Sequence, residues 1–323
     1  MVSFVALRAE PAGCDEVLGQ RLSEIPGLEV RRREPLRRYT SLRLGGVADW
    51  LVIPSSLEQL AAVLRTTWAL GCPVTVLGGG SNLLIADTGL RGVVIRIGRS
   101  LGRLVWDGPR LWAQAGASLP AVARQAAMRR LSGLEFAAGI PGTLGGAIVM
   151  NAGAHQGDMA AVVTRVQAVH RSGRLVEFSR EACRFRYRGS RFLDEPEWIV
   201  AAAELLLRPD DPDRIAQRMQ DYLKRRRDSQ PLGTYNAGSI FKNPPGDYAG
   251  RLIEQAGCKG WREGGAEVST LHANFIVHHG DATASDVWRL IQRVRREVEK
   301  KFGVRLELEV GVLGFPEETG IEV

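Results

Sequence analysis

Two glycine-rich segments constrain the fold of this chain more than any other feature. Three consecutive glycines follow a short apolar run at residues 78–80, and residues 139–153 contain five glycines, a proline and an asparagine. Glycine allows positive φ and lets a ligand or another chain segment approach the main chain closely. One such segment is most simply a turn. Two of them, about sixty residues apart, indicate a backbone surface that wraps around a large ligand.

Neither segment matches the common nucleotide-binding motifs. The first lacks the GxGxxG spacing of a dinucleotide-binding turn, and no GK[ST] follows it. Consecutive glycines nevertheless leave main-chain N–H groups open to a diphosphate, and Ser81 and Asn82 add side-chain donors. We therefore expect a ligand that carries a diphosphate, with a glycine-rich β-turn as the alternative interpretation of the first segment.

Hydrophobic periodicity places these segments among alternating strands and helices. Helical spacing is clearest at residues 284–302, with Ser285 as the expected N-cap and Gly303 as the residue after the helix. A turn-rich acidic stretch at 209–213 separates this last third from the rest. We predict an α+β fold in three parts. The expected strands are 50–54, 73–77, 92–97, 104–106, 111–115, 163–170, 175–178 and 198–207, the other expected helices are 14–25, 56–70, 118–130 and 214–226, and the expected domains are 1–104, 105–209 and 210–323.

Composition excludes several classes of protein. With 45% hydrophobic and 24% charged residues among 323, the chain is not disordered. Its net charge of +7 comes from dispersed arginines, since lysine occupies only five positions, and no nucleic-acid-binding module is visible. Four separated cysteines without a CxxC pair predict neither a metal site nor disulfides, and no apolar stretch is long enough to cross a bilayer. We expect a cytoplasmic protein without membrane or nucleic-acid partners.

Three polar motifs lie outside the glycine segments: Tyr187-Arg188-Gly189-Ser190-Arg191-Phe192, Gly238-Ser239-Ile240-Phe241-Lys242-Asn243-Pro244, and Leu306-Glu307-Leu308-Glu309-Val310. Taken singly, each has a simple structural interpretation. Arg188 is then a surface arginine, Ser239 a turn residue, and Glu309 a solvent-facing residue of an alternating strand.

As an ordered set, these motifs carry a resemblance. The glycine segments look like the phosphate-contacting loops of the vanillyl-alcohol-oxidase (PCMH-type) FAD-binding domain. Together with the three polar motifs, the Gly45-Gly46 step and residues 271–276, they resemble the UDP-N-acetylenolpyruvoylglucosamine reductase family from about residue 40 to 314. Only residues 193–197 separate Phe192 from the next strand, which is similar to the shorter subclass of that family.

The resemblance implies an FAD-dependent enzyme with NADPH as reductant. FAD is expected to be non-covalent, because the histidine near the motifs, His155, follows the second loop rather than lying in the first. The implied FAD-binding residues are Gly78, Gly79, Gly80, Ser81, Asn82, Gly139, Ile140, Pro141, Gly142, Gly145, Gly146, Asn151 and Gly153.

The resemblance also implies the chemistry. The substrate is an enolpyruvyl ether on a UDP-sugar, Arg188 stabilises the developing negative charge, Glu309 is its acidic partner, and Ser239 donates a proton. Tyr187, Lys242 and Asn243 are the implied substrate-binding residues, and a monomer or weak oligomer is expected. Two alternatives stay open: an FAD-dependent sugar or alcohol oxidase of the same fold, and a basic nucleotide- or RNA-binding protein supported by the run at residues 224–227.

Overall fold

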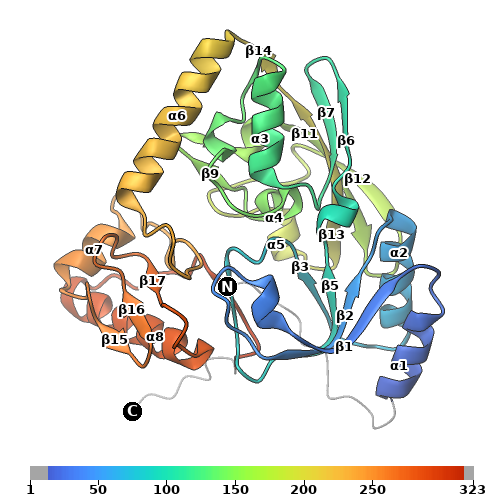
Figure 1. Ribbon diagram of the computed structural model, residues 1–323, viewed down its shortest axis with the longest axis horizontal. Coiled ribbons are helices and arrows are strands. Elements are labelled where there is room, and N and C mark those ends of the chain that lie inside the picture. Colours follow the sequence, from blue (N-terminus) through green and yellow to red (C-terminus); the bar gives the residue numbers. More distant parts are fainter. Residues whose placement is uncertain (1–13, 316–323) are drawn as a thin grey trace.

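The computed structural model describes residues 14–315, and its first part is a sheet with both faces covered (Figure 1). The strand order is β1-β2-β5-β3, antiparallel only between β1 and β2. Trp50 and Val52 pack with helix α2, whereas Leu51 belongs to a smaller core on the other face. Burial on both faces explains why β5 contains consecutive apolar residues. The elements are α1 Cys14–Ser23, β1 Glu29–Pro35, η1 Leu36–Tyr39, β2 Val47–Ile53, α2 Leu57–Ala69, β3 Val74–Leu77, β4 Leu83–Ile85, β5 Leu90–Arg96 and η2 Arg99–Leu101.

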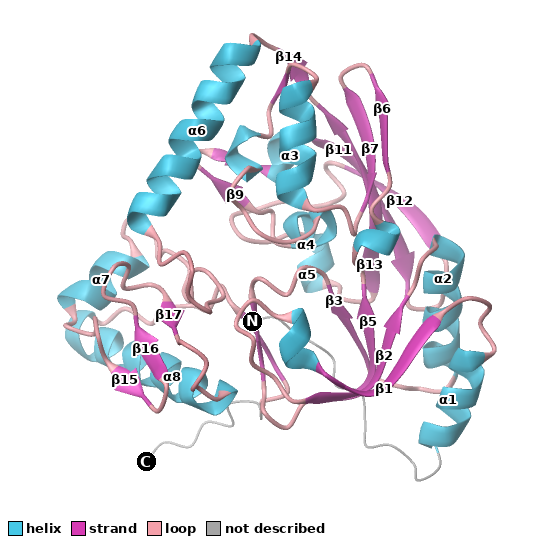
Figure 2. Ribbon diagram, viewed as in Figure 1, coloured by secondary structure: helices cyan, strands magenta, loops and turns pink. Residues whose placement is uncertain are grey.

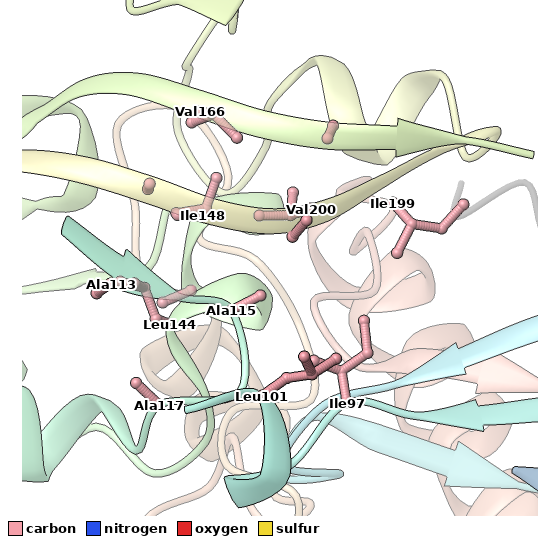
Figure 3. Close-up of a cluster of buried hydrophobic side chains, with 14 of the residues drawn as sticks. Ile97, Leu101, Ala113, Ala115, Ala117, Leu144, Ile148, Val166, Ile199 and Val200 are labelled. Atoms are coloured by element: carbon pink, nitrogen blue, oxygen red, sulfur yellow. The ribbon is translucent and has the colours of Figure 1, made fainter. Parts of the chain in front are cut away.

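The second part is built on an antiparallel sheet of order β12-β11-β13-β7-β6. One face packs against α4, and Figure 3 shows Leu144 and Ile148 of that helix among Ala113, Val166 and Val200 of the sheet. Small alanines in β7 and β13 let the helix lie close to the strands. The elements are β6 Leu104–Asp107, β7 Arg110–Gln114, α3 Leu119–Met128, β8 Leu131–Ser132, η3 Glu135–Ala137, α4 Leu144–Val149, β9 Gly153–Ala154, β10 Gly157–Asp158, η4 Met159–Ala161, β11 Val163–His170, β12 Leu175–Ser179, α5 Arg191–Asp194, β13 Trp198–Leu206 and β14 Arg208–Pro209.

The third part is mostly helix and loop, as Figure 2 shows, and has a core of its own. That core also includes Leu42, Leu44 and Leu84 of the first part. Helix α6 packs against η3 and α3 of the second part rather than within the third. The elements are α6 Pro212–Ser229, α7 Ala249–Gln255, β15 Arg262–Glu263, β16 Ala266–Val268, β17 Ile276–Val277, α8 Ala284–Phe302 and β18 Gly311–Leu313.

The chain returns to its first part after α8. Strand β18 pairs in parallel with β4, and Gly311 N donates to Asn82 O at 3.0 Å. The segment that precedes β18 therefore lies beside the loop that precedes β4. This brings residues near 309 next to residues near 82.

Most strongly periodic segments fold as expected, and the predicted α+β class is confirmed. The N-cap of α8 is a correction. Thr283, not Ser285, caps the helix, accepting from Asp286 N at 3.1 Å in a capping box, while the Ser285 hydroxyl donates to Asp87. Strand β1 was not predicted, because an arginine-rich edge strand has no apolar alternation to reveal it. Within residues 14–315, no helix combines the length and apolarity that crossing a bilayer needs.

Candidate functional site

A cavity of about 1450 Å³ lies where the three parts meet. Its lining includes both glycine-rich loops, α6, and the segments that carry Arg188, Ser239 and Glu309. Residues that lie far apart in the sequence therefore line the same cavity. That volume is larger than a single drug-sized ligand needs, so the cavity has room for more than one ligand.

The first glycine loop, residues 78–82, follows β3 and abuts the second loop. A Cβ added to Gly79 would lie 2.4 Å from Gly142 Cα, and one added to Gly80, whose φ is +63°, would lie 1.8 Å from Tyr39 O. The Ser81 hydroxyl donates to Pro141 O at 2.9 Å. Only glycine permits this packing, so the loop shape is set by the missing side chains.

The second loop, residues 139–146, leads into α4. Gly142 has φ +122°, and a Cβ on Gly145 would lie 2.8 Å from Ala115 Cβ. Thr143 Oγ1 accepts from Gly146 N at 3.4 Å and caps the helix. Ile140 and Pro141 complete this side of the cavity, together with Gly139 and Gly146. The two loops form a backbone cradle without carboxylates, which fits a diphosphate such as that of FAD.

Asn151 and Gly153 separate in the structure. Gly153 lines the cavity, but Asn151 is buried away from it. The Asn151 amide donates to Asp158 Oδ2 at 3.1 Å and to Arg186 O at 3.0 Å. Asn151 thus anchors the chain just before Arg188 instead of facing the cavity.

Arg188 sits on a tight turn. The main chains of Arg186 and Gly189 exchange hydrogen bonds of 3.0 and 3.2 Å, which leaves Tyr187 and Arg188 at the two corners. Arg188 has φ 51°, a conformation that costs a residue with a Cβ roughly 1–2 kcal/mol. Its guanidinium lies 5.1 Å from the ring centroid of Tyr187, which is 55% exposed. Such backbone strain is concentrated at functional sites.

Glu309 is the partner of Arg188. Arg188 Nε donates to Glu309 Oε1 at 2.6 Å, and both side chains are largely buried. Burial raises the pKa of the Glu309 carboxyl, while the charges of Arg188 and Lys242 act in the opposite direction. The main chain of Glu309 is fixed by Ile240 O, which accepts from its N–H at 2.8 Å, and by Asn82, whose amide donates to Glu309 O at 2.9 Å.

Ser239 enters the cavity from a clamped segment. Gly238, with φ 77°, turns the chain just before it. After it, the buried amide of Asn274 accepts from Phe241 N at 2.9 Å and donates to Phe241 O at 2.8 Å. The sequence pointed to residues 271–276 only as part of the resemblance, and Asn274 was not predicted to hold this segment.

Comparison with known proteins identifies the family of the protein that contains this cavity. Residues 48–179 match the family model "FAD binding domain", and residues 230–313 match "UDP-N-acetylenolpyruvoylglucosamine reductase, C-terminal domain". The protein named UDP-N-acetylenolpyruvoylglucosamine reductase 2 of Symbiobacterium thermophilum is 50% identical over 300 residues, covering 92% of this chain and 97% of the relative. The chain belongs to the UDP-N-acetylenolpyruvoylglucosamine reductase family.

Two further comparisons agree with this assignment. The reductase of Geobacillus kaustophilus is 45% identical over 300 residues, covering 93% of this chain and 98% of the relative. The crystal structure of the Thermus caldophilus reductase has a TM-score of 0.76 at 38% identity, covering 89% of this chain and 99% of that one. The resemblance seen in the sequence is confirmed, and with it the PCMH-type FAD-binding fold and an FAD-dependent oxidoreductase rather than an oxidase.

Three residues implied as substrate-binding in this reductase family do not line the cavity. Lys242 Nζ lies 3.4 Å from Glu307 Oε2, and the Asn243 side chain accepts from Ala249 N at 3.1 Å at the start of α7. Tyr187 is also outside the lining, on the exposed side of Arg188. These three side chains border the site through their neighbours.

Helix α6 contributes a wall that the sequence did not assign to the site. The signal was present, since the basic run at residues 224–227 ends an amphipathic helix. Without a partner element to pack against, the face that such a run presents is not determined by the sequence. The α6 residues that line the cavity of this family member are Gln217, Gln220, Asp221, Leu223, Lys224, Arg226 and Arg227.

Proposed function

We propose that this cavity carries out the NADPH-dependent reduction of UDP-N-acetylglucosamine enolpyruvate to UDP-N-acetylmuramate, a step of peptidoglycan precursor synthesis. Family membership supports the reaction. The main structural support for assigning the reaction to particular residues is the 2.6 Å ion pair of Arg188 and Glu309, which lies in the cavity that the glycine loops also line.

The glycine loops at residues 78–82 and 139–146 hold the pyrophosphate of FAD in this proposal. When bound there, FAD would supply the hydride, obtained from NADPH, that reduces the terminal carbon of the enolpyruvyl double bond. Attachment is non-covalent, because His155 lies outside the cavity lining and stacks on Tyr222 with ring centroids 4.1 Å apart. Main-chain N–H groups bind the phosphates while the close Gly79–Gly142 contact keeps the two loops together.

Arg188 stabilises the negative charge that builds beside the substrate's carboxylate as the double bond is reduced. A guanidinium is permanently charged and forms two parallel hydrogen bonds to a carboxylate, so it favours the charged transition state over the ground state. Glu309 holds the guanidinium through Nε, which leaves its other N–H groups for the substrate. Because the pair is largely buried, this attraction is stronger than it would be in water.

Ser239 protonates the substrate carbon next to the carboxylate. A hydroxyl is a weak acid, and it serves here because the developing enolate is a strong base and the hydroxyl is held in place. Asn274 and Glu309 fix the main chain of residues 240–241 on either side. Ser239 therefore presents its hydroxyl from a rigid segment.

The remaining assignments belong to the same proposal. Tyr187, Lys242 and Asn243 contact the substrate once the cavity is filled, and Asn151 acts on FAD binding through the loop it anchors. Residues 1–104 and 105–209 form the FAD-binding subdomains and residues 210–323 the substrate-binding domain, in a monomer or weak oligomer in the cytoplasm. The buried thiols of Cys183 and Cys258, which form no disulfide, fit that reducing compartment.

An anaerobic flavin titration tests the proposal. The purified protein is reduced with NADPH without oxygen and then mixed with UDP-N-acetylglucosamine enolpyruvate. We expect the oxidised-flavin absorption band to return at once. A flavin that stays reduced until air is admitted would contradict the proposal and favour an oxidase, and failure to bind flavin would remove the assignment of the glycine loops.

A further inference from the structure

Helix α6 is anchored to the second part of the molecule through Arg218 in its N-terminal half. Arg218 donates to Glu135 at 2.7 Å and to Asp210 at 2.5 Å, and Glu135 is buried in the second part of the molecule. Figure 1 shows α6 running along that part towards α7. The last turns of α6 follow this anchor and line the cavity.

Arg226 lies directly on the second glycine loop. A Cβ added to Gly139 would lie 3.0 Å from Arg226 Cδ, 3.8 Å from its Nε and 3.4 Å from Leu223 Cδ2. Glycine at position 139 thus allows the helix to approach the loop closely. Both Arg226 and Gly139 line the cavity.

Within residues 14–315, Arg226 forms no ion pair, and burial lowers the pKa of its guanidinium without an opposing carboxylate. Its neighbours Lys224, Arg225 and Arg227 are exposed, whereas Arg226 is half-buried. A guanidinium remains charged at neutral pH, so a half-buried one without a carboxylate is stabilised by an anionic ligand.

We propose that Arg226 supplies the positive charge that neutralises the FAD pyrophosphate. The reaction brings three diphosphates to the cavity, those of FAD, of NADPH and of the UDP-sugar. The contact with Gly139 assigns Arg226 to the first, because that loop is the one proposed for FAD. The inference rests on the proposed placement of FAD. It also explains the basic run at residues 224–227 as part of the flavin site rather than a nucleic-acid surface.

Equilibrium binding of FAD to apo-protein tests this inference without any turnover. Wild type, Arg226→Gln and the matched control Arg225→Gln are titrated with FAD by flavin fluorescence at low and high salt. Arg225 lies on the same helical turn but outside the cavity lining. We expect the FAD Kd of Arg226→Gln to rise about 10- to 100-fold with a weaker salt dependence, as for loss of a charge-assisted hydrogen bond. Arg225→Gln should bind FAD like wild type.

Two outcomes would overturn the inference. One is an unchanged FAD Kd in folded Arg226→Gln. The other is normal FAD affinity with a raised KM for the UDP-sugar, which assigns the charge to the substrate. Arg226→Met, whose stem still packs on Gly139, repeats the test if the glutamine variant does not fold, and Arg226→Lys should recover part of the affinity. The readout is independent of flavin reoxidation by the enolpyruvyl sugar, so its failure is distinguishable from failure of the proposed function.

Discussion

The cradle formed by the glycine loops and the catalytic cluster of Arg188, Ser239 and Glu309 are built in opposite ways. The cradle consists of main chain, and its shape follows from missing side chains at Gly79 and Gly142. The cluster consists of side chains from three distant segments, and the Arg188–Glu309 pair joins two of them across 121 residues.

This difference predicts different responses to mutation. Adding atoms should damage the cradle, because it has no space for them. Removing atoms should damage the cluster, because each side chain acts at a defined place. Variants of the first kind should lower FAD affinity, and variants of the second kind should lower turnover while FAD remains bound.

Ser239→Ala should show the largest effect of the second kind. Loss of a positioned proton donor is expected to slow reoxidation of the reduced flavin by the enolpyruvyl sugar about 10²–10⁴-fold. Reduction of the flavin by NADPH should keep its wild-type rate. Stopped-flow absorbance measures the two half-reactions separately, and a wild-type rate for reoxidation would show that another group donates the proton.

Arg188→Ala should follow. Removal of the charge beside the developing enolate is expected to reduce kcat about 10²–10³-fold, while FAD stays bound and thermal unfolding changes little. Arg184→Ala is the matched control, since Arg184 pairs with Glu195 at the exposed surface nearby. Steady-state kinetics on flavin-saturated protein provide the measurement. Loss of FAD from Arg188→Ala would mean that the two regions are not independent.

Gly79→Ala tests the first kind of damage. Its Cβ would meet Gly142 Cα at 2.4 Å, so the two loops must separate. Because overpacking costs about 1–3 kcal/mol, we expect the FAD Kd to rise about tenfold or more, with kcat nearly unchanged at saturating FAD. Gly98→Ala, whose Cβ meets nothing closer than 3.7 Å, serves as control. Flavin fluorescence titration measures the FAD affinity of each variant. Equal FAD affinities for Gly79→Ala and wild type would contradict the close-contact explanation.

The pH dependence of kcat should give the smallest effect. Burial raises the pKa of the Glu309 carboxyl. As the pH falls, Glu309 should therefore become protonated, and lose its ion pair with Arg188, at a higher pH than an exposed glutamate would. Glu309→Gln should lose this acid limb and have a lower kcat throughout.

Stability should respond to the same titration with a defined sign. A carboxyl whose pKa rises on folding stabilises the folded state when it is protonated. This stabilisation is lost as the pH rises through the folded-state pKa. The free energy of unfolding of wild type relative to Glu309→Gln should therefore decrease with increasing pH. Urea titrations across this range measure it, and an increase would contradict the raised pKa.

Local patterns were sufficient to predict much of the fold and the cradle. Helix α2 and strand β13 have strong periodicity, and the glycine loops are contiguous in sequence. The N-cap of α8 was wrong because Ser285 bonds Asp87, a residue almost two hundred positions away. Tertiary contacts of this kind override a local signal.

The site walls were less predictable for the same reason. Nothing local to residues 224–227 shows that one of the three arginines packs on Gly139, since that requires the Arg218–Glu135 contact to orient α6. For Asn151 the local signal was misleading. Its glycine-rich surroundings predicted contact with a ligand, whereas its amide donates to the main-chain oxygen of Arg186. Side-chain direction depends on packing partners that the sequence does not reveal.

The parallel pairing of β18 with β4 has a consequence for biosynthesis. Translation produces the FAD cradle, Arg188 and Ser239 before Glu309, and residues 311–313 then add a strand beside β4. A nascent chain that has emerged only as far as α8 contains every element of the cradle but no partner for the Arg188 guanidinium. The catalytic ion pair is thus assembled last, when the C-terminal segment reaches back to a strand made more than two hundred residues earlier.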